Sequence, residues 1–100
     1  MHRLEDIYRR AVEAVLLVGG IREEQLFVCR SDRCVTARVV LVDVLVQIGF
    51  SEADIVALSG MSQQRVNSLK NSARYRLMGL AARIMREEVG KIIGEHIVQY

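Results

Sequence analysis

Hydrophobic and polar positions alternate with a helical period along the first part of the chain. Apolar residues recur every three or four positions between charged ones, at Leu4, Ile7, Ala11, Ala14, Val15 and Val18. This pattern predicts an amphipathic helix that ends at Gly19–Gly20, because glycine accepts the left-handed conformation of a C-cap. In the connector 21–30, we expect Ile21, Leu26 and Phe27 to pack onto the core and residues 22–25 to form a helical turn.

The stretch 33–48 is almost entirely apolar. Its polar residues Thr36, Asp43 and Gln47 are four or seven positions apart, which places them on one face of a helix. A strand is less consistent with this stretch, because the run is long and its polar positions do not alternate. We therefore predict a nearly buried central helix, capped by Ser31 or Asp32 and ended by Gly49.

Two shorter helices are predicted over 51–59 and 62–77. Ser51 and Asp54 resemble a capping box, Ile55 and Leu58 supply a buried face, and Ser59–Gly60–Met61 interrupts the pattern. Ser62 caps the second helix. Its apolar stripe is Val66, Leu69, Ala73 and Leu77, and its polar stripe is Gln63, Gln64, Asn67, Lys70, Asn71 and Arg74.

The apolar period continues to Ile97, with Gly79 and Gly90 as candidate breaks or close-packing points, and we expect a separate final helix. With 100 residues, 51% hydrophobic composition and no proline, the chain suits one small domain with a single core. The predicted fold is all-α: one domain over 1–100, of about five helices, with a helix-turn-helix at about 51–77.

Several absences limit the classes of protein. The N-terminal residues contain no apolar signal segment, and the longest apolar stretch, 39–48, is too short to span a membrane. We therefore expect a cytoplasmic protein with no membrane attachment, in which Cys29 and Cys34 are reduced, buried thiols. The spacing of the cysteines and of His2 and His96 does not suit zinc, so we expect no metal and no cofactor.

Positive charge is concentrated in one segment, although the net charge is only +2. Residues 1–50 balance seven basic against seven acidic groups, whereas residues 62–86 contain six cations and no acid. Such a segment is typical of a protein that binds a polyanion, although a solvated helix face has the same composition.

The acid-free segment and the helix pair together predict a DNA-binding helix-turn-helix, in which the second helix enters the major groove. Amide side chains at the start of that helix can bond the edge of adenine, and cations further along can neutralise phosphates. The candidate DNA-binding residues are Ser62, Gln63, Gln64, Arg65, Asn67, Lys70, Asn71, Arg74 and Arg76. We expect a small transcriptional regulator that binds double-stranded DNA.

The segment also resembles a known family. Gly49–Phe50–Ser51, Asp54–Ile55, Met61–Ser62, Val66, Ser68 and Ala73–Arg74–Tyr75–Arg76–Leu77 are similar to the C-terminal helix-turn-helix of LuxR-type regulators and to sigma-factor region 4. The likeness covers about 30 residues and implies that the helix from Ser62 is the recognition helix. A weaker resemblance, to the DNA-binding domain of the replication initiator DnaA, rests on Ser31, Arg33, Val35, Ala37–Arg38, Gly49, Ile55, Gly60 and Val66.

An alternative function follows from three departures from the pattern of LuxR-type regulators and sigma-factor region 4. Val56 replaces a small alanine, Ser59 replaces leucine before the turn, and Arg65 replaces a common threonine. The scaffold can therefore have been adapted to bind protein, through the apolar tail Val89, Ile92, Ile93, Ile97 and Val98. This stripe is either core against the 4–18 helix or a dimer seam, and we predict a mixture of both in a homodimer. No phosphate loop, nucleophile elbow or metal-hydrolase spacing occurs, so we expect no enzyme.

Overall fold

The computed structural model describes the backbone of residues 3–97 and the side chains of residues 3–94, and this part of the chain is all-α. The six helices in this range are α1 (Leu4–Gly19), α2 (Glu23–Leu26), α3 (Asp32–Ile48), α4 (Glu52–Ser59), α5 (Gln63–Arg76) and α6 (Leu80–Ile97). The one helix beyond the predicted five is α2, a four-residue helix in the connector for which only a helical turn was expected.

Local hydrogen bonds define the helix ends where the sequence predicted them. The chain leaves α1 through Gly20, whose left-handed backbone (φ 65°) lets its N–H donate to the Leu16 carbonyl at 2.9 Å. Ser31 is the residue that caps α3, because its Oγ accepts from the Cys34 N–H at 3.3 Å. Gly79 lies between α5 and α6, whereas α6 continues through Gly90 without a break.

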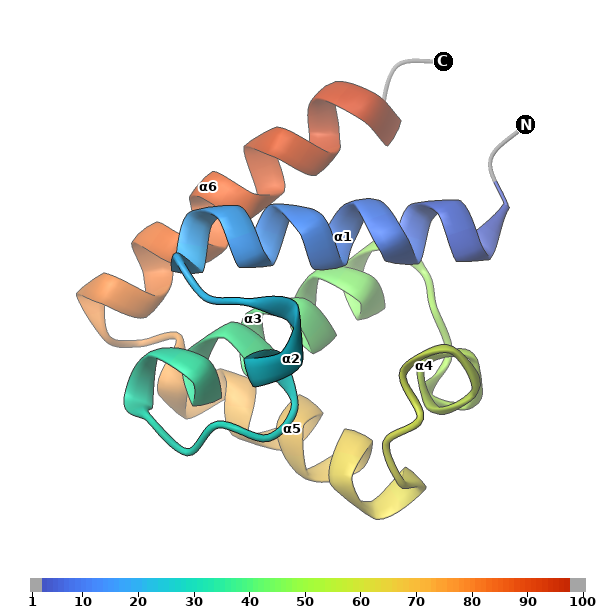
Figure 1. Cartoon of the computed structure of the whole chain (residues 1–100), viewed down its shortest axis with the longest axis horizontal. Coiled ribbons are helices and arrows are strands. Elements are labelled where there is room, and N and C mark those ends of the chain that lie inside the picture. The colour runs from blue at the N-terminus through green and yellow to red at the C-terminus, as the bar shows by residue number, and fades with distance from the viewer. Residues whose placement is uncertain (1–2, 98–100) are drawn as a thin grey trace.

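The central helix α3 contacts each of the other five helices and forms the middle of the core. Ala37, Val40, Leu41 and Leu45 on α3 are completely buried. In Figure 1, α1 and α6 lie above α3, and α5 lies below it. The nearly continuous apolar sequence of α3 is explained by this position, because neighbours cover it on several sides and leave little of its surface for water.

Helix α6 packs on α1 and α3, so the described residues of the apolar tail belong to the core of the single chain. Val89 and Ile93 are buried there, and Ile92 is half-buried against the same cluster. The Ile97 side chain and Val98 lie outside the part that the structure describes. The predicted homodimer remains a prediction.

No helix within residues 3–97 combines the length and apolar character that crossing a bilayer requires.

Candidate nucleic-acid interface

Helices α4 and α5 are joined by a short connection whose geometry is held by local hydrogen bonds. The Asp54 N–H donates to Ser51 Oγ and the Ser51 N–H donates to Asp54 Oδ2, both at 3.1 Å, which completes the predicted capping box. At the end of α4, Gly60 is left-handed (φ 79°). The α5 cap is Ser62, whose Oγ accepts from the Arg65 N–H at 3.1 Å. The sequence therefore predicted both caps and the glycine between them.

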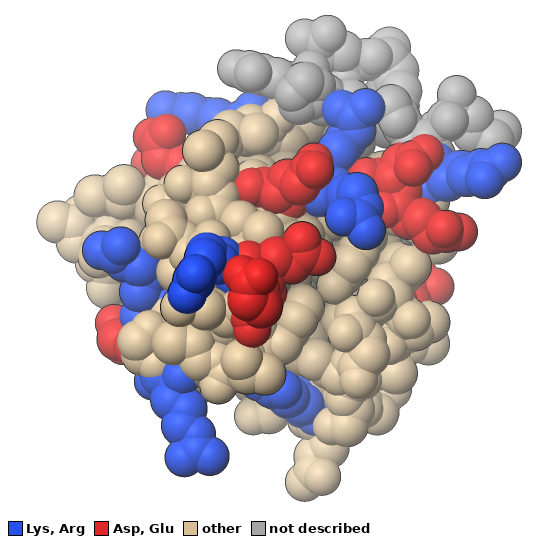
Figure 2. All heavy atoms as spheres, in the orientation of Figure 1, with Lys and Arg blue, Asp and Glu red and all other residues tan. Residues whose placement is uncertain are grey.

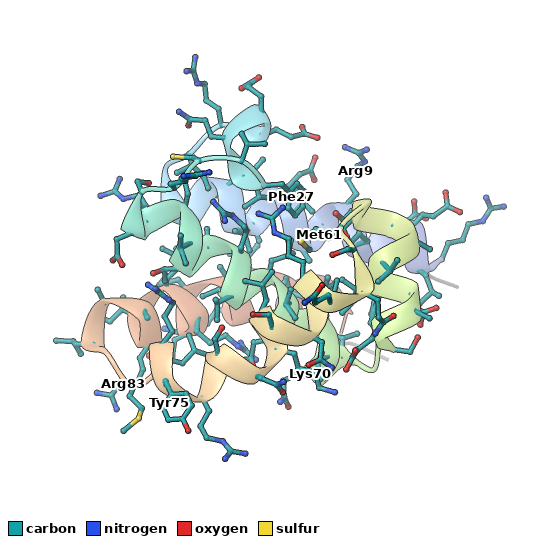
Figure 3. The ribbon with its side chains drawn as sticks, turned by 90° about the horizontal axis from the view of Figure 1, so that it is seen from below. Arg9, Phe27, Met61, Lys70, Tyr75 and Arg83 are labelled. Atoms are coloured by element: carbon teal, nitrogen blue, oxygen red, sulfur yellow. The ribbon has the colours of Figure 1, made fainter. Side chains whose placement is uncertain are left out.

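Helix α5 buries one side and exposes the other as its sequence predicts. Val66 and Ala73 are buried, and Leu69 and Leu77 are half-buried against the core. All members of the polar stripe are exposed: Gln63, Gln64, Asn67, Lys70, Asn71 and Arg74. Seen from below in Figure 3, α5 runs across the front of the molecule, with Lys70 and Tyr75 at its lower edge. A shallow hollow of about 390 Å³ beside it is lined by Lys70, Asn71, Arg74 and Tyr75.

Three side chains of this stripe converge on one carboxylate, that of Glu52 in the first turn of α4. The Gln63 amide nitrogen donates to Glu52 Oε1 at 2.6 Å, and the Asn67 amide nitrogen reaches the same oxygen at 3.4 Å. Lys70 Nζ forms an ion pair with Glu52 Oε2 at 3.2 Å. Sequence reasoning missed Glu52, because only the way in which α4 lies against α5 brings its side chain to this face.

Arg65 lies half-buried at the start of α5, and its guanidinium is directed at the protein backbone. Its NH2 donates to the Phe27 carbonyl at 2.7 Å. On the adjacent carbonyl, Arg38 Nε donates to the Leu26 oxygen at 2.6 Å, while Arg38 NH2 is buried with no partner among the described residues. Burial, and secondarily the neighbouring Arg65 cation, lowers the pKa of Arg38. The two arginines thus hold the end of α2 against α3 and α5.

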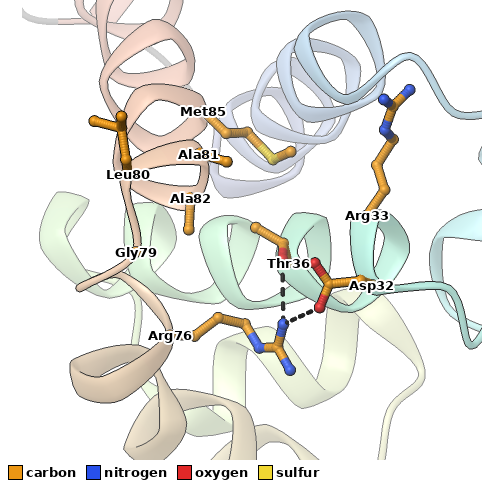
Figure 4. A pocket seen from close by; sticks show the side chains of 9 residues that line it. All are labelled: Asp32, Arg33, Thr36, Arg76, Gly79, Leu80, Ala81, Ala82 and Met85. Atoms are coloured by element: carbon orange, nitrogen blue, oxygen red, sulfur yellow. Dashed lines mark hydrogen bonds and ion pairs between the residues drawn. The ribbon is translucent and has the colours of Figure 1, made fainter.

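Arg76 and Arg86 are also engaged within the chain. Arg76 NH1 lies 2.9 Å from Asp32 Oδ1 and 3.3 Å from Thr36 Oγ1, contacts that Figure 4 shows beside a hollow of about 460 Å³. Arg86 Nε lies 2.7 Å from Asp43 Oδ2. Each pair joins α3 to a later helix.

The positive charge of the acid-free segment 62–86 is therefore largely neutralised by groups from other parts of the chain. Of its six cations, only Arg74 and Arg83 have no hydrogen-bond or ion-pair partner among the described residues. Carboxylates from α3 and α4 bind three of the others, and the Phe27 carbonyl binds Arg65. On the face in Figure 2, acidic and basic side chains are interspersed, whereas the outer side of α5 turns downward in this view and is seen face-on in Figure 3.

Cys29 lies in the connector before α3, and Cys34 lies in the first turn of α3. Cys34 is buried as expected, whereas Cys29 is half-buried and lies 3.4 Å from Ser31 Oγ. Hydrogen bonding from the Ser31 side chain, then from Cys34 and the Ser31 backbone, lowers the pKa of Cys29 to about 7.

In residues 3–94, no group of three or more His, Cys, Asp or Glu side chains is placed to hold a metal ion. The exposed polar side of α5, with Glu52 beside it, is thus the candidate site that the geometry presents. No protein-family model matches the chain, and neither a curated protein nor a solved structure shows significant similarity to it.

Proposed function

We propose that the chain is a small DNA-binding regulator in which α4 and α5 act as a helix-turn-helix. The carrying observation is the exposed side of α5, where amide and cationic side chains follow one another from Gln63 to Arg74 and the large side chain of Tyr75 comes only after them. A helix of this kind, with a capped N-terminus and a free outer side, suits the major groove of duplex DNA. The proposal includes a cytoplasmic location.

The contacts within the chain divide the candidate residues into two groups. Gln64 and Arg74 are exposed and have no side-chain partner among the described residues, so they are free to contact a base edge and a phosphate. Ser62 offers the helix N-terminus to a phosphate. Gln63, Asn67 and Lys70 must first leave Glu52, and Asn71 is bonded to Asn67 at 2.7 Å. Arg65 and Arg76 are engaged with the protein itself.

This division predicts weak binding by a single copy. Each phosphate contact contributes about −0.9 to the slope of log affinity against log salt. With Lys70 held by Glu52, Arg74 supplies the contact, so one copy should show a slope of roughly −1. A homodimer bound at two half-sites would double this slope, and this is the form of the protein that we propose.

The test is selection from random duplexes with the purified full chain, at about 50 mM salt, where phosphate contacts are strong. We expect one motif to be enriched, and the Gln64→Ala variant to lose preference at one base position. Each good base contact supplies about 1–3 kcal/mol of discrimination. Absence of any binding at this salt concentration would rule out the proposed function.

A second candidate function is a protein-interaction module, favoured by an apolar corner where α5 meets α6. Tyr75, Met78, Leu80 and Ile84 are all exposed there, within ten residues of one another. A concentration of exposed apolar side chains in one short segment is typical of an interaction surface. Sedimentation over a concentration series tests self-association: we expect a dimer that Met78→Ser with Leu80→Ser dissociates. A monomer at every concentration would remove the homodimer from both proposals.

A further inference from the structure

Glu52 makes contacts with α5 that a DNA-binding helix pair does not require. Its carboxylate receives three donors from the outer side of α5, and its side chain is only 22% exposed because of them. The contacts span 11 to 18 residues of sequence, so the packing of α4 on α5 creates them. Local capping does not need Glu52, since Ser51 and Asp54 complete the capping box alone.

We propose that Glu52 restrains α5, by keeping Gln63, Asn67 and Lys70 on the protein and opposing attachment to the DNA backbone. This inference rests on the proposed function and names how the same site is regulated. DNA must displace the carboxylate from these three donors before α5 can use them.

Electrostatics explains the opposition. In a docked helix-turn-helix the first helix crosses the phosphate backbone, so a carboxylate in the first turn of α4 lies near phosphates of the same charge. If Lys70 stays with Glu52, it adds no phosphate contact. If Lys70 moves to a phosphate, Glu52 loses its counter-charge beside the DNA. In both cases Lys70 adds little net affinity for the DNA backbone. Binding then depends on the hydrogen bonds that the amides of Gln63 and Asn67 form with base edges.

The consequence is low occupancy of unrelated DNA. Backbone attachment supplies most of non-specific affinity, and Glu52 removes one cation from it. The missing affinity has two sources. A second copy of the chain doubles the number of contacts, and a DNA sequence with well-placed acceptors bonds Gln63 and Asn67.

The test compares Glu52→Gln with wild type on an unrelated duplex, with affinity measured by fluorescence anisotropy from about 50 to 200 mM salt. Glutamine keeps the size of the side chain and removes its charge. We expect affinity at 0.1 M salt to rise about tenfold and the salt slope to steepen by about 0.9, the effect of one added phosphate contact.

Glu13→Gln is the matched control. Glu13 is exposed on α1, which lies across α3 from α5 in Figure 1, so this variant changes net charge equally without touching α5. It should leave affinity nearly unchanged. Adding Lys70→Gln to Glu52→Gln should cancel the gain in slope, because the freed cation is then absent.

Each outcome decides the inference. An equal gain in Glu52→Gln and Glu13→Gln assigns the effect to net charge and overturns the restraint. Wild-type binding with an unchanged Glu52→Gln variant overturns the restraint while the proposed DNA function stands. A loss of affinity in Glu52→Gln means that the carboxylate contacts DNA, for example a cytosine amino group, and overturns it also. If no variant binds at about 50 mM salt, the DNA function fails and the restraint fails with it.

Discussion

The guanidinium of Arg65, in the first turn of α5, donates to the backbone carbonyl of Phe27 at 2.7 Å. The two residues are 38 positions apart in sequence, so the bond ties α5 to the connector that leads into α3. With Arg38 on the neighbouring Leu26 carbonyl, it satisfies two acceptors at the end of α2. Arg65, which the sequence predicts as a DNA contact, therefore holds α5 against the connector before α3.

Replacing Arg65 should therefore lower stability. Arg65→Gln removes a charged donor from the Phe27 carbonyl, and we expect a loss of about 1–3 kcal/mol in the free energy of unfolding, from urea titration followed by circular dichroism. Arg74→Gln, at an exposed position, should change this free energy by less than about 0.5 kcal/mol. Equal stability of the two variants would show that the Arg65 bond contributes little.

Arg74 and Arg76 should differ in their effects on DNA binding. Arg74 is exposed and has no partner among the described residues, whereas Arg76 is paired with Asp32. Arg74→Gln should reduce affinity about tenfold at 0.1 M salt and make the salt slope shallower by about 0.9. Arg76→Gln should reduce affinity much less. Fluorescence anisotropy with one duplex measures both, and a larger effect of Arg76→Gln would contradict the assignment.

The turn between α4 and α5 should depend on Gly60. Its φ of 79° is strained for a residue with a Cβ, so Gly60→Ala should destabilise the fold by about 1 kcal/mol. Gly94→Ala is the control, because Gly94 is helical and its added Cβ meets no atom of the described side chains within 4 Å. That variant should stabilise by up to about 1 kcal/mol. Thermal unfolding of both gives the comparison, and the opposite order would refute it.

Cys29 should react as a thiolate near neutral pH. Hydrogen bonding, first from the Ser31 side chain, lowers its pKa from 9.0 to about 7, so alkylation by iodoacetamide should rise with a midpoint near pH 7. Because the folded pKa lies below the unfolded value, this ionisation favours the folded state fully above pH 9 and loses that effect as pH falls to 7.

The Cys29→Ser variant should lose the fast alkylation, since the remaining thiol of Cys34 is buried. In Ser31→Ala the midpoint should move towards 9. Mass spectrometry of timed samples identifies the modified residue. A midpoint near 9 in the wild type would contradict the assigned hydrogen bonding.

Much of the fold was predictable from the sequence, because its signals act over a few residues. The caps at Ser31, Ser51 and Ser62 and the helix ends at Gly20 and Gly60 all lie where the pattern predicts them. Each involves hydrogen bonds that span three or four residues, so the chain needs no distant partner to specify them. The buried and exposed sides of α5 follow likewise from its period.

The partners of the charged side chains were decided by the tertiary structure. The sequence shows six cations without an acid over 62–86, but it does not show that Glu52, Asp32 and Asp43 come to lie beside three of them. Coulomb energy depends on distance in space, and the packing of α3 and α4 against α5 and α6 sets those distances. The sequence by itself determined the helices and their exposed polar face, and the tertiary structure determined how much of the positive charge on them is free.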